Sequence, residues 1–383
     1  RQRTRHLWLK SLQLANFRNY SQLNVDFSVG QVLLYGQNGE GKTNLVEAVS
    51  YLSTLESHRV SGYQTLIQKD QPTAQLSGKV NHNSRELLIG VELNKESNNR
   101  YFLNGSARKK TSEILGLIRT VSFSPEDLDL IRRDPGDRRK FLDSSLVQLK
   151  PRLSGVKADY ERVLKQRNAL LKSARGIKNP ELSTLEIWND QLVALGTELA
   201  AERLELVTAL SPLLQNFYTA LSDSKDEISL RLVSAVGSDE NEKWTDIESD
   251  PKIYSQLFYE RLESLRTKEL ERGITLAGPH RDELLIDKAG LLARTHASQG
   301  EAWSLALGLK LALGDVSRKT SNNGDPILLL DDVFAVLDKG RRERLVEFVT
   351  DYEQVLITAA DETMAPNLDW SGKMHVSGGV VSA

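Results

Sequence analysis

Hydrophobic and polar residues alternate along most of the chain from position 7 to position 27. Such period-two alternation is typical of strands with one buried face. The apolar positions of this pattern are Leu7, Leu9, Leu12, Leu14, Leu23, Val25 and Phe27. The unbroken run Val32-Leu33-Leu34 predicts a further strand that is buried on both faces, as strands of parallel sheets are.

A second set of alternating runs lies between Thr73 and Lys110. Asn104-Gly105, between two of these runs, is a strong signal for a two-residue hairpin. The pattern therefore predicts an antiparallel sheet that is added to the core containing Val32-Leu33-Leu34.

The hydrophobic period lengthens to three and four residues after Phe123. Ser124-Pro125 is a good helix start, because Ser suits the N-cap and Pro the first helical position. Two apolar stripes follow on either side of residues 176–180. Their members are Leu153, Val156, Tyr160, Val163, Leu164, Leu170 and Leu171, then Leu185, Trp188, Leu192, Leu195 and Leu199. We expect an antiparallel helical hairpin with arms of about 25 to 40 residues, or roughly 37 to 60 Å at 1.5 Å per residue.

An acidic, polar stretch over 238–251 and a helix from about 253 to 271 complete this mainly helical region. The chain is longer than one ordinary core requires. We expect an α/β fold with an N-terminal lobe over 1–123, an inserted helical lobe over 124–272, and the remainder of the first lobe over 273–383.

The composition is ordinary for a soluble globular protein. Charged residues make up 27% and hydrophobic residues 39%, and there is no cysteine, which excludes disulfides and thiolate chemistry. No apolar run is long enough for a membrane span and no signal-peptide pattern is present. We expect a cytoplasmic protein without a membrane partner.

Positive charge is concentrated in one segment, although the formal net charge is −2. Between Ser106 and Lys178 there are 18 Lys and Arg residues against nine Asp and Glu residues. This excess indicates a surface that faces a polyanion.

The chain from Gly36 to Thr43 matches the phosphate-binding loop pattern G-x-x-x-x-G-K-[ST]. Its members are Gly36, Gln37, Asn38, Gly39, Glu40, Gly41, Lys42 and Thr43. The glycines allow backbone N–H groups to turn inward around phosphate oxygens. Lys42 would reach the β- and γ-phosphates, and the Thr43 hydroxyl would ligate Mg²⁺. The sequence therefore predicts an ATP and Mg²⁺ site.

The aliphatic run Ile327–Leu330 ends in Asp331 and Asp332. An ordinary strand end also has this pattern, but the phosphate loop makes a second half of the nucleotide site the stronger interpretation. A buried parallel strand would place both carboxylates at the edge of the sheet where ligands collect. Asp331 would hold Mg²⁺ through water, and Asp332 would accept a proton from the attacking water.

Ser298-Gln299-Gly300 precedes a helical stretch. Ser298 with Glu301 is a plain capping box. The same helix N-terminus can also present free N–H groups to the γ-phosphate of a nucleotide held by another protomer. The two interpretations are compatible.

Seven motifs together resemble the RecF family within the SMC class of ABC-type ATPase heads. They are Asn16–Tyr20, Gly36–Asn44, Ser124–Leu128, Arg138–Asp143, Gly278–Asp282, Ser298–Gly300 and Leu329–Asp338. They span almost the whole chain. One departure follows the signature, where the family often has Gln-Gln-Arg and this chain has Glu301-Ala302-Trp303.

The resemblance implies an ABC-type P-loop ATPase head that dimerises around two ATP molecules. Arg18 would contact the nucleotide, and Ser298, Gln299 and Gly300 would complete the nucleotide site of the partner subunit. The catalytic residues would then be Lys42, Asp332, Ser298 and Gly300. It also implies weak, DNA-stimulated ATP hydrolysis, and action at gapped DNA with RecR and RecO to help load RecA.

The basic segment Lys150–Lys178 is the candidate DNA surface, although basic helix faces are also commonly only solvated. Binding there would be directed to phosphates, with little sequence preference. The candidate contacts are Lys150, Arg152, Lys157, Arg162, Lys165 and Lys172. Three rivals are another SMC-like repair ATPase head, the energising subunit of a membrane transporter, and a nucleotide sensor without turnover.

Overall fold

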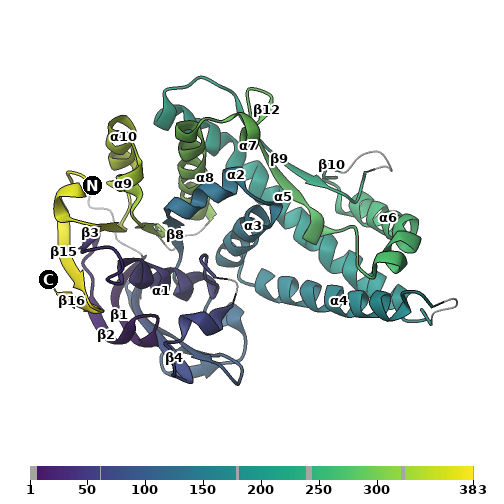
Figure 1. Cartoon of the computed structure of the whole chain (residues 1–383), viewed down its shortest axis with the longest axis horizontal. Coiled ribbons are helices and arrows are strands. Elements are labelled where there is room, and N and C mark those ends of the chain that lie inside the picture. The colour runs from purple at the N-terminus through teal and green to yellow at the C-terminus, as the bar shows by residue number, and fades with distance from the viewer. Residues whose placement is uncertain (1–6, 61, 178–180, 239–243, 321–323, 383) are drawn as a thin grey trace.

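The computed structural model describes residues 7–60, 62–177, 181–238, 244–320 and 324–382. It has a rounded body, and a helical arm built on α4 and α6 extends from one side of it (Figure 1). Among the described residues, no helix is long and apolar enough to cross a membrane.

A mixed six-stranded sheet forms the centre of the body, in the order β16-β15-β3-β14-β13-β8. Its strands are β3 (Gly30–Tyr35), β8 (Thr120–Phe123), β13 (Ile327–Leu330), β14 (Gln354–Ala359), β15 (Trp370–Ser377) and β16 (Val380–Ser382). All neighbours are parallel except β15 and β16. Alternate residues of β13 enter different hydrophobic clusters, with Leu328 on one face and Leu329 on the other. The predicted burial on both faces is thus confirmed for β13 and equally for the 32–34 run.

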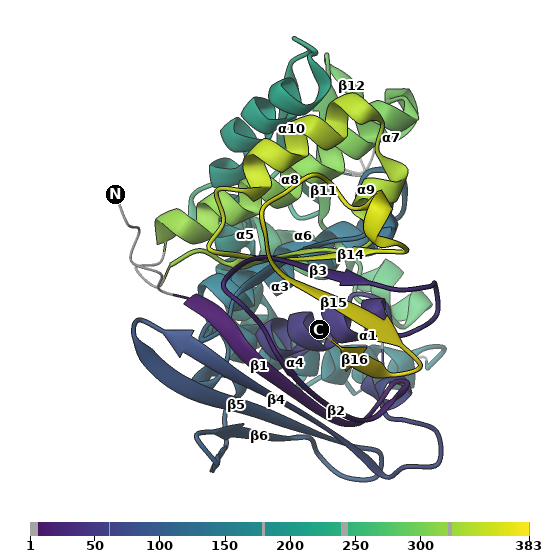
Figure 2. The same ribbon diagram turned by 90° about the vertical axis from the view of Figure 1, so that its left-hand side faces the viewer.

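An antiparallel sheet lies below this core and encloses α1 (Lys42–Thr54) with it (Figure 2). Its order is β2-β1-β4-β5-β6-β7. The strands are β1 (Leu7–Phe17), β2 (Tyr20–Asp26), β4 (Thr73–His82), β5 (Arg85–Asn94), β6 (Arg100–Leu103) and β7 (Ser106–Arg108). The register of β1 against β4 shifts between Leu9 and Ser11. This irregularity explains why the buried positions of β1 change from odd numbers, Leu7 and Leu9, to even numbers, Leu12 and Leu14.

The predicted Asn104-Gly105 hairpin joins β6 to β7, and both residues have positive φ, 51° and 78°. The predicted antiparallel sheet is therefore confirmed, together with its two-residue hairpin at Asn104-Gly105.

The upper part of the body is helical. Helix α8 (Gln299–Thr320) packs there against the second half of the longer α5 (Leu185–Ser222). The shorter helices are α2 (Leu128–Arg132), α3 (Pro135–Leu149), α7 (Ala293–His296), α9 (Val333–Val336) and α10 (Lys339–Val349). The predicted helix start at Ser124 is a single 3₁₀ turn, Pro125–Asp127, capped by Ser124, and α2 follows it directly.

The arm contains the predicted helical hairpin. Its two helices are α4 (Leu153–Ala174) and the first half of α5, which pack on each other and on α6 (Pro251–Arg272). Tyr160, Val163, Leu192 and Leu199 from the two predicted stripes form its core with Phe258 of α6. Part of the connecting turn, 178–180, lies outside the described residues.

A third sheet, of four strands, was not expected from the sequence. Its order is β10-β9-β11-β12, with β9 (Ile228–Ser234), β10 (Thr245–Asp246), β11 (Glu283–Lys288) and β12 (Leu291–Leu292). β9 lies inside the segment predicted to be mainly helical, and it pairs with β11 beyond residue 272. A lobe boundary at residue 272 would therefore divide this sheet, because β9 and β11 form backbone hydrogen bonds with each other.

Candidate nucleotide-binding site

The phosphate loop connects β3 to α1, as the sequence predicts. Lys42 is only 3% exposed, and its ammonium donates to the carbonyl oxygens of Gly36 (2.6 Å) and Gln37 (2.9 Å). The side chain thus lies inside the curve of its own loop, where a phosphate oxygen would meet it.

Glycine is required at position 41 for two reasons. Its φ is +117°, and a Cβ there would lie 2.7 Å from both the Asn19 amide nitrogen and the Tyr20 hydroxyl. The Tyr20 hydroxyl donates to the Gly41 carbonyl (2.9 Å). The turn between β1 and β2 therefore supports the phosphate loop from behind, which connects the antiparallel sheet to the site.

Asp331 lies at the end of β13 and faces Thr43. Its Oδ1 accepts hydrogen bonds from the Thr43 hydroxyl (3.2 Å) and from the Thr358 hydroxyl at the end of β14 (2.6 Å). Burial raises the pKa of Asp331, and the two hydroxyl donors partly offset this rise. The structure thus brings together the two residues predicted to bind the metal ion.

Asp332 follows in a left-handed conformation with φ 52°. Its backbone N–H donates to the Thr358 hydroxyl (2.9 Å). Thr358 therefore holds the Asp331 carboxylate and the Asp332 backbone at once, a role that the sequence reasoning missed. A threonine at the end of a buried strand next to the Asp-Asp strand could have indicated it.

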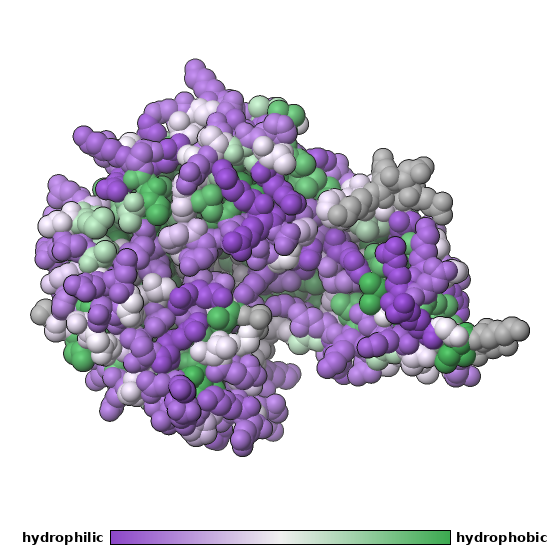
Figure 3. All heavy atoms as spheres, viewed as in Figure 1, coloured by the Kyte–Doolittle hydropathy of each residue, from purple (hydrophilic) through white to green (hydrophobic). Residues whose placement is uncertain are grey.

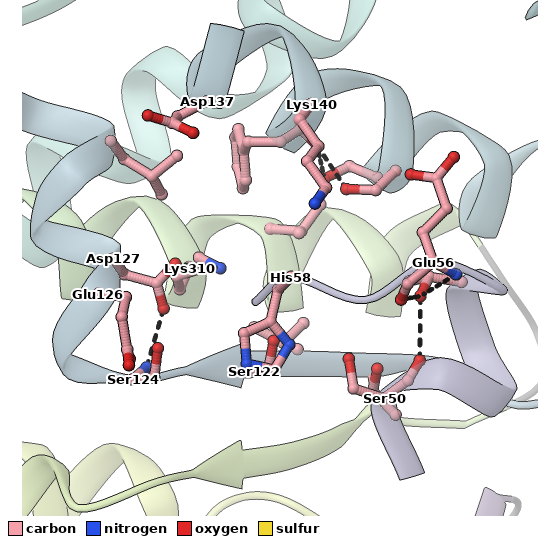
Figure 4. A pocket seen from close by; sticks show the side chains of 18 of the residues that line it. Ser50, Glu56, His58, Ser122, Ser124, Glu126, Asp127, Asp137, Lys140 and Lys310 are labelled. Atoms are coloured by element: carbon pink, nitrogen blue, oxygen red, sulfur yellow. Dashed lines mark hydrogen bonds and ion pairs between the residues drawn. The ribbon is translucent and has the colours of Figure 1, made fainter. Parts of the chain in front are cut away.

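A cavity of about 150 Å³ lies beside this edge of the sheet, between β8, α1, α3 and α8. Ser124, Glu126 and Asp127 lie together at one end of it, and His58 lies in the middle (Figure 4). Lys310 of α8 pairs with Asp127 (2.9 Å). Glu126 is close enough to Asp331 to raise its pKa further, so the Ser124–Asp127 turn belongs to the surroundings of the nucleotide site.

Arg18 does not point into open solvent but binds a buried carboxylate of α1. Its Nε and Nη2 donate to the two carboxylate oxygens of Glu47 at 2.9 and 2.8 Å. Ser57 (2.5 Å) and Arg59 (3.3 Å) also donate to Glu47, which is fully buried. Sequence reasoning missed Glu47 and Arg59, because an acidic residue within a helix gives no signal of its burial.

Ser298, Gln299 and Gly300 lie at the N-terminus of α8. The predicted capping box is present: Ser298 N–H donates to Glu301 (2.7 Å), and Glu301 N–H donates to the Ser298 hydroxyl (3.3 Å). Ser298 and Gln299 are exposed. The departure Ala302-Trp303 is explained by packing, because both residues are buried and the Trp303 ring lies 5.8 Å from that of Phe123.

The two halves of the predicted site lie apart in one chain. Helix α7, which ends two residues before Ser298, lies well away from α1 in both ribbon views (Figures 1 and 2). The structure therefore unites Lys42, Thr43, Asp331 and Asp332, but it does not bring Ser298–Gly300 to them.

The six predicted DNA contacts lie on α4 or just before it, and four of them already pair with carboxylates. These pairs are Lys150 with Glu202 and Glu205, Arg152 with Glu198 and Glu202, Lys157 with Glu56, and Arg162 with Asp159. Lys165 and Lys172 are exposed and form no ion pair with any described residue.

Not all of the positive charge between Ser106 and Lys178 reaches the surface. Arg119, Arg138 and Arg167 are 3%, 4% and 1% exposed. Arg138 binds Glu283 (2.7 Å) and Arg167 binds Glu269 (2.7 Å). These cations stabilise the interior, so the charge count overstates the surface available to a polyanion.

Comparison with known proteins places this geometry in a known group. A family model described as RecF/RecN/SMC N terminal domain matches residues 8–380. The DNA replication and repair protein RecF of Clavibacter sepedonicus is 44% identical over 389 residues, which cover 97% of this chain and 94% of the relative. The protein of the same name from Leifsonia xyli subsp. xyli is 47% identical over 356 residues, which cover 91% of this chain and 92% of the relative.

Solved structures agree with these relatives. One described as the recombination mediator protein RecF-ATP in the RecFOR pathway has a TM-score of 0.89 at 27% identity, covering 100% of this chain and 98% of that chain. A second, described as RecF-ATPrS, has a TM-score of 0.87 at 28% identity, covering 98% of each chain. The Smc head domain of Pyrococcus furiosus, at 18% identity and a TM-score of 0.53, covers 98% of this chain and 95% of that chain and shares the fold.

Proposed function

The chain belongs to the RecF family of DNA replication and repair proteins, within the RecF/RecN/SMC group, and on this basis we propose that it is an ATP-dependent DNA-binding protein of recombinational repair. ATP joins two copies of the chain into a clamp at gapped or single-strand/duplex DNA. Slow, DNA-stimulated ATP hydrolysis then releases the clamp. In this role the protein acts with RecR and RecO to help load RecA.

The residues of the phosphate loop suit the binding of ATP. When ATP binds, the Lys42 ammonium exchanges its hydrogen bonds to the Gly36 and Gln37 carbonyls for bonds to phosphate oxygens. The positive N-terminal end of α1 faces the same phosphates. The exchange costs little, because the ammonium keeps the same number of oxygen partners in a buried position.

The Thr43 hydroxyl and the Asp331 carboxylate fit Mg²⁺, which prefers oxygen ligands and keeps several waters. They share a hydrogen bond, so both oxygens already face one point. When bound there, Mg²⁺ would offset the negative charge of the β- and γ-phosphates. Asp332, whose backbone N–H donates to Thr358, accepts the proton of the attacking water with its carboxylate.

The observation that carries the proposal is the separation of the two half-sites. A helix N-terminus with an exposed Ser298 is a ready anion site, but it lies away from the phosphate loop of its own chain. A second copy, related by a two-fold axis, supplies it to the first copy's nucleotide, and each copy does the same for the other.

Light scattering after size exclusion tests this proposal. The Asp332→Asn chain with ATP and Mg²⁺ should elute as a dimer, because the proton acceptor for hydrolysis is lost while ATP binding is kept. Ser298→Arg should stay monomeric and still bind ATP, whereas Lys42→Met should lose both properties. A monomeric Asp332→Asn chain at saturating ATP, even with duplex DNA present, would contradict the proposal.

A further inference from the structure

A second and larger cavity lies between the antiparallel sheet of the body and the arm. Its volume is about 700 Å³, which is within the range of pockets that bind small ligands. Figure 3 shows the surface notched on this side, where the rounded body meets the arm. The cavity is distinct from the phosphate loop, because no residue between Gly36 and Thr43 lines it.

Two cations line the cavity without a carboxylate partner. Arg139 and Lys140 are neighbours on α3 and are half-buried. Arg139 donates to the backbone carbonyl of Asp282 (2.8 Å), and Lys140 donates to the carbonyl of Ser57 (2.6 Å). Neither forms an ion pair with a described residue. Burial lowers the pKa of both groups, so a bound anion would stabilise their charged forms.

The other charges of the cavity largely cancel. Lys157 pairs with Glu56 (2.7 Å), and Arg203 pairs with Asp143 (2.8 Å). Glu161 is the lining acid that forms no ion pair with a described residue, and the buried Asp282 lies 3.8 Å from Arg203. The four cations of the lining exceed its three acids by one charge, in a partly water-excluded place where a charge-assisted hydrogen bond is strong.

Aromatic side chains also line the cavity. Tyr63 and Tyr101 line the cavity from the body and are half-buried, with Tyr51 behind them and Tyr160 on the arm. Tyrosine rings offer flat faces on which a nucleobase stacks whatever its identity. Cations beside stacking rings form the combination that recognises a base and its phosphate together.

We propose that this cavity is a second ligand site, which takes a nucleoside phosphate, either free or as an unpaired nucleotide of a DNA strand. The phosphate lies against Arg139 and Lys140, and the base stacks on Tyr63 or Tyr101. The site is separate from the phosphate loop, so it does not depend on the ATP-dependent dimerisation proposed above.

Binding to the full chain with Lys42→Met tests the site, because this change silences the phosphate loop. Calorimetric titrations use deoxyadenosine monophosphate, the single strand (dA)₄, deoxyadenosine and inorganic phosphate. We expect saturable binding of the monophosphate or of (dA)₄. Lys140→Gln and Tyr101→Leu should each weaken it by about tenfold, and Lys140→Arg should retain it.

Lys268→Gln and Tyr259→Leu are matched controls on the arm outside the cavity and should leave the affinity unchanged. Binding of the free monophosphate identifies a free nucleotide as the ligand, and binding of (dA)₄ alone identifies a strand. The proposal fails if neither probe binds, if Lys140→Gln binds like its parent chain, or if inorganic phosphate binds as tightly as the monophosphate. ATP-induced dimerisation of Lys140→Gln with an intact Lys42 separates this failure from that of the clamp.

Discussion

Glu47 is a single buried carboxylate that holds three parts of the nucleotide site together. It lies on α1, directly behind the phosphate loop, and binds Arg18, Ser57 and Arg59. Burial alone would raise the pKa of Glu47, but the hydrogen bonds and charges of these partners outweigh it and lower the pKa below 4.5. The Glu47 carboxylate is therefore charged in the folded protein at neutral pH.

Glu47→Gln should destabilise the protein at pH 7 by about 2 kcal/mol, because hydrogen bonds to a charged group are lost. The folded state holds its proton less tightly than the unfolded state. The stabilisation is thus fully present above pH 4.5 and is lost as the pH falls through the lower, folded pKa. The free energy of unfolding, measured with urea, should differ less between wild type and variant near pH 4 than at pH 7. Glu86→Gln, at an exposed carboxylate, is the control, and an equal difference at both pH values would contradict this role of Glu47.

Residues with a fixed chemical role were the easiest to predict from the sequence. Thr43 of the phosphate loop lies next to Asp331, as expected. Both the loop and the end of the Asp-Asp strand must lie at the carboxyl edge of the same parallel sheet, which leaves few possible arrangements. Thr358 and Glu47 were not predicted, because their roles arise from neighbours 27 and 29 residues away along the chain. Such pairings are set by packing and have no local pattern.

Helix α4 carries structural and exposed cations on opposite faces. Arg167 is buried and binds Glu269, Asn189 and Thr275. Lys165 and Lys172, one heptad apart, are exposed on the other side. Arg167 therefore holds the arm together, whereas Lys165 and Lys172 are free to meet phosphates.

Replacing both Lys165 and Lys172 by Gln should weaken DNA binding without changing stability. Each lost phosphate contact reduces the slope of log K against log salt by about 0.9. Fluorescence anisotropy at several salt concentrations should thus show a slope smaller by about 2, with ATP affinity unchanged. Arg167→Met, the comparison variant, leaves Glu269 unpaired and should cost about 3–5 kcal/mol of stability. An unchanged slope in the double variant would place the DNA elsewhere.

Elements with a long periodic pattern were predicted well, and short ones were not. The hairpin of α4 and α5 follows from apolar stripes of several turns. Strand β9 has only seven residues and lies between long helices, so its alternation was read as part of a helical region. Its partner β11 follows 49 residues after β9 ends, counted from Ser234 to Glu283, and only the fold shows that the two meet.

At the scale of the whole molecule, the proposed clamp predicts that two surfaces respond differently to ATP. The phosphate loop would contact ATP in a single copy, whereas the start of α8 would gain protection only if a second copy covered it. Hydrogen exchange measures the two surfaces separately.

With ATP and Mg²⁺, the Asp332→Asn chain should show slower exchange both over 36–44 and over 299–303. Adding Ser298→Arg should keep the first protection and abolish the second. Exchange over 228–234 in β9 serves as the internal reference, since the strand lies within a sheet. Protection of 299–303 that persists in the Ser298→Arg chain would show that ATP acts on α8 within one copy.

Helix α5 passes through both parts of the molecule, with Pro212 in its interior. Its 38 residues extend over about 57 Å. Leu192 and Leu199 belong to the core of the arm, whereas Leu210 and Leu221 belong to the core that contains α8. Arm and body are therefore joined through one helix, in which Pro212 removes one backbone hydrogen bond. Because sharp kinks of helices occur at such prolines, a change of angle between the arm and the body would be taken up there.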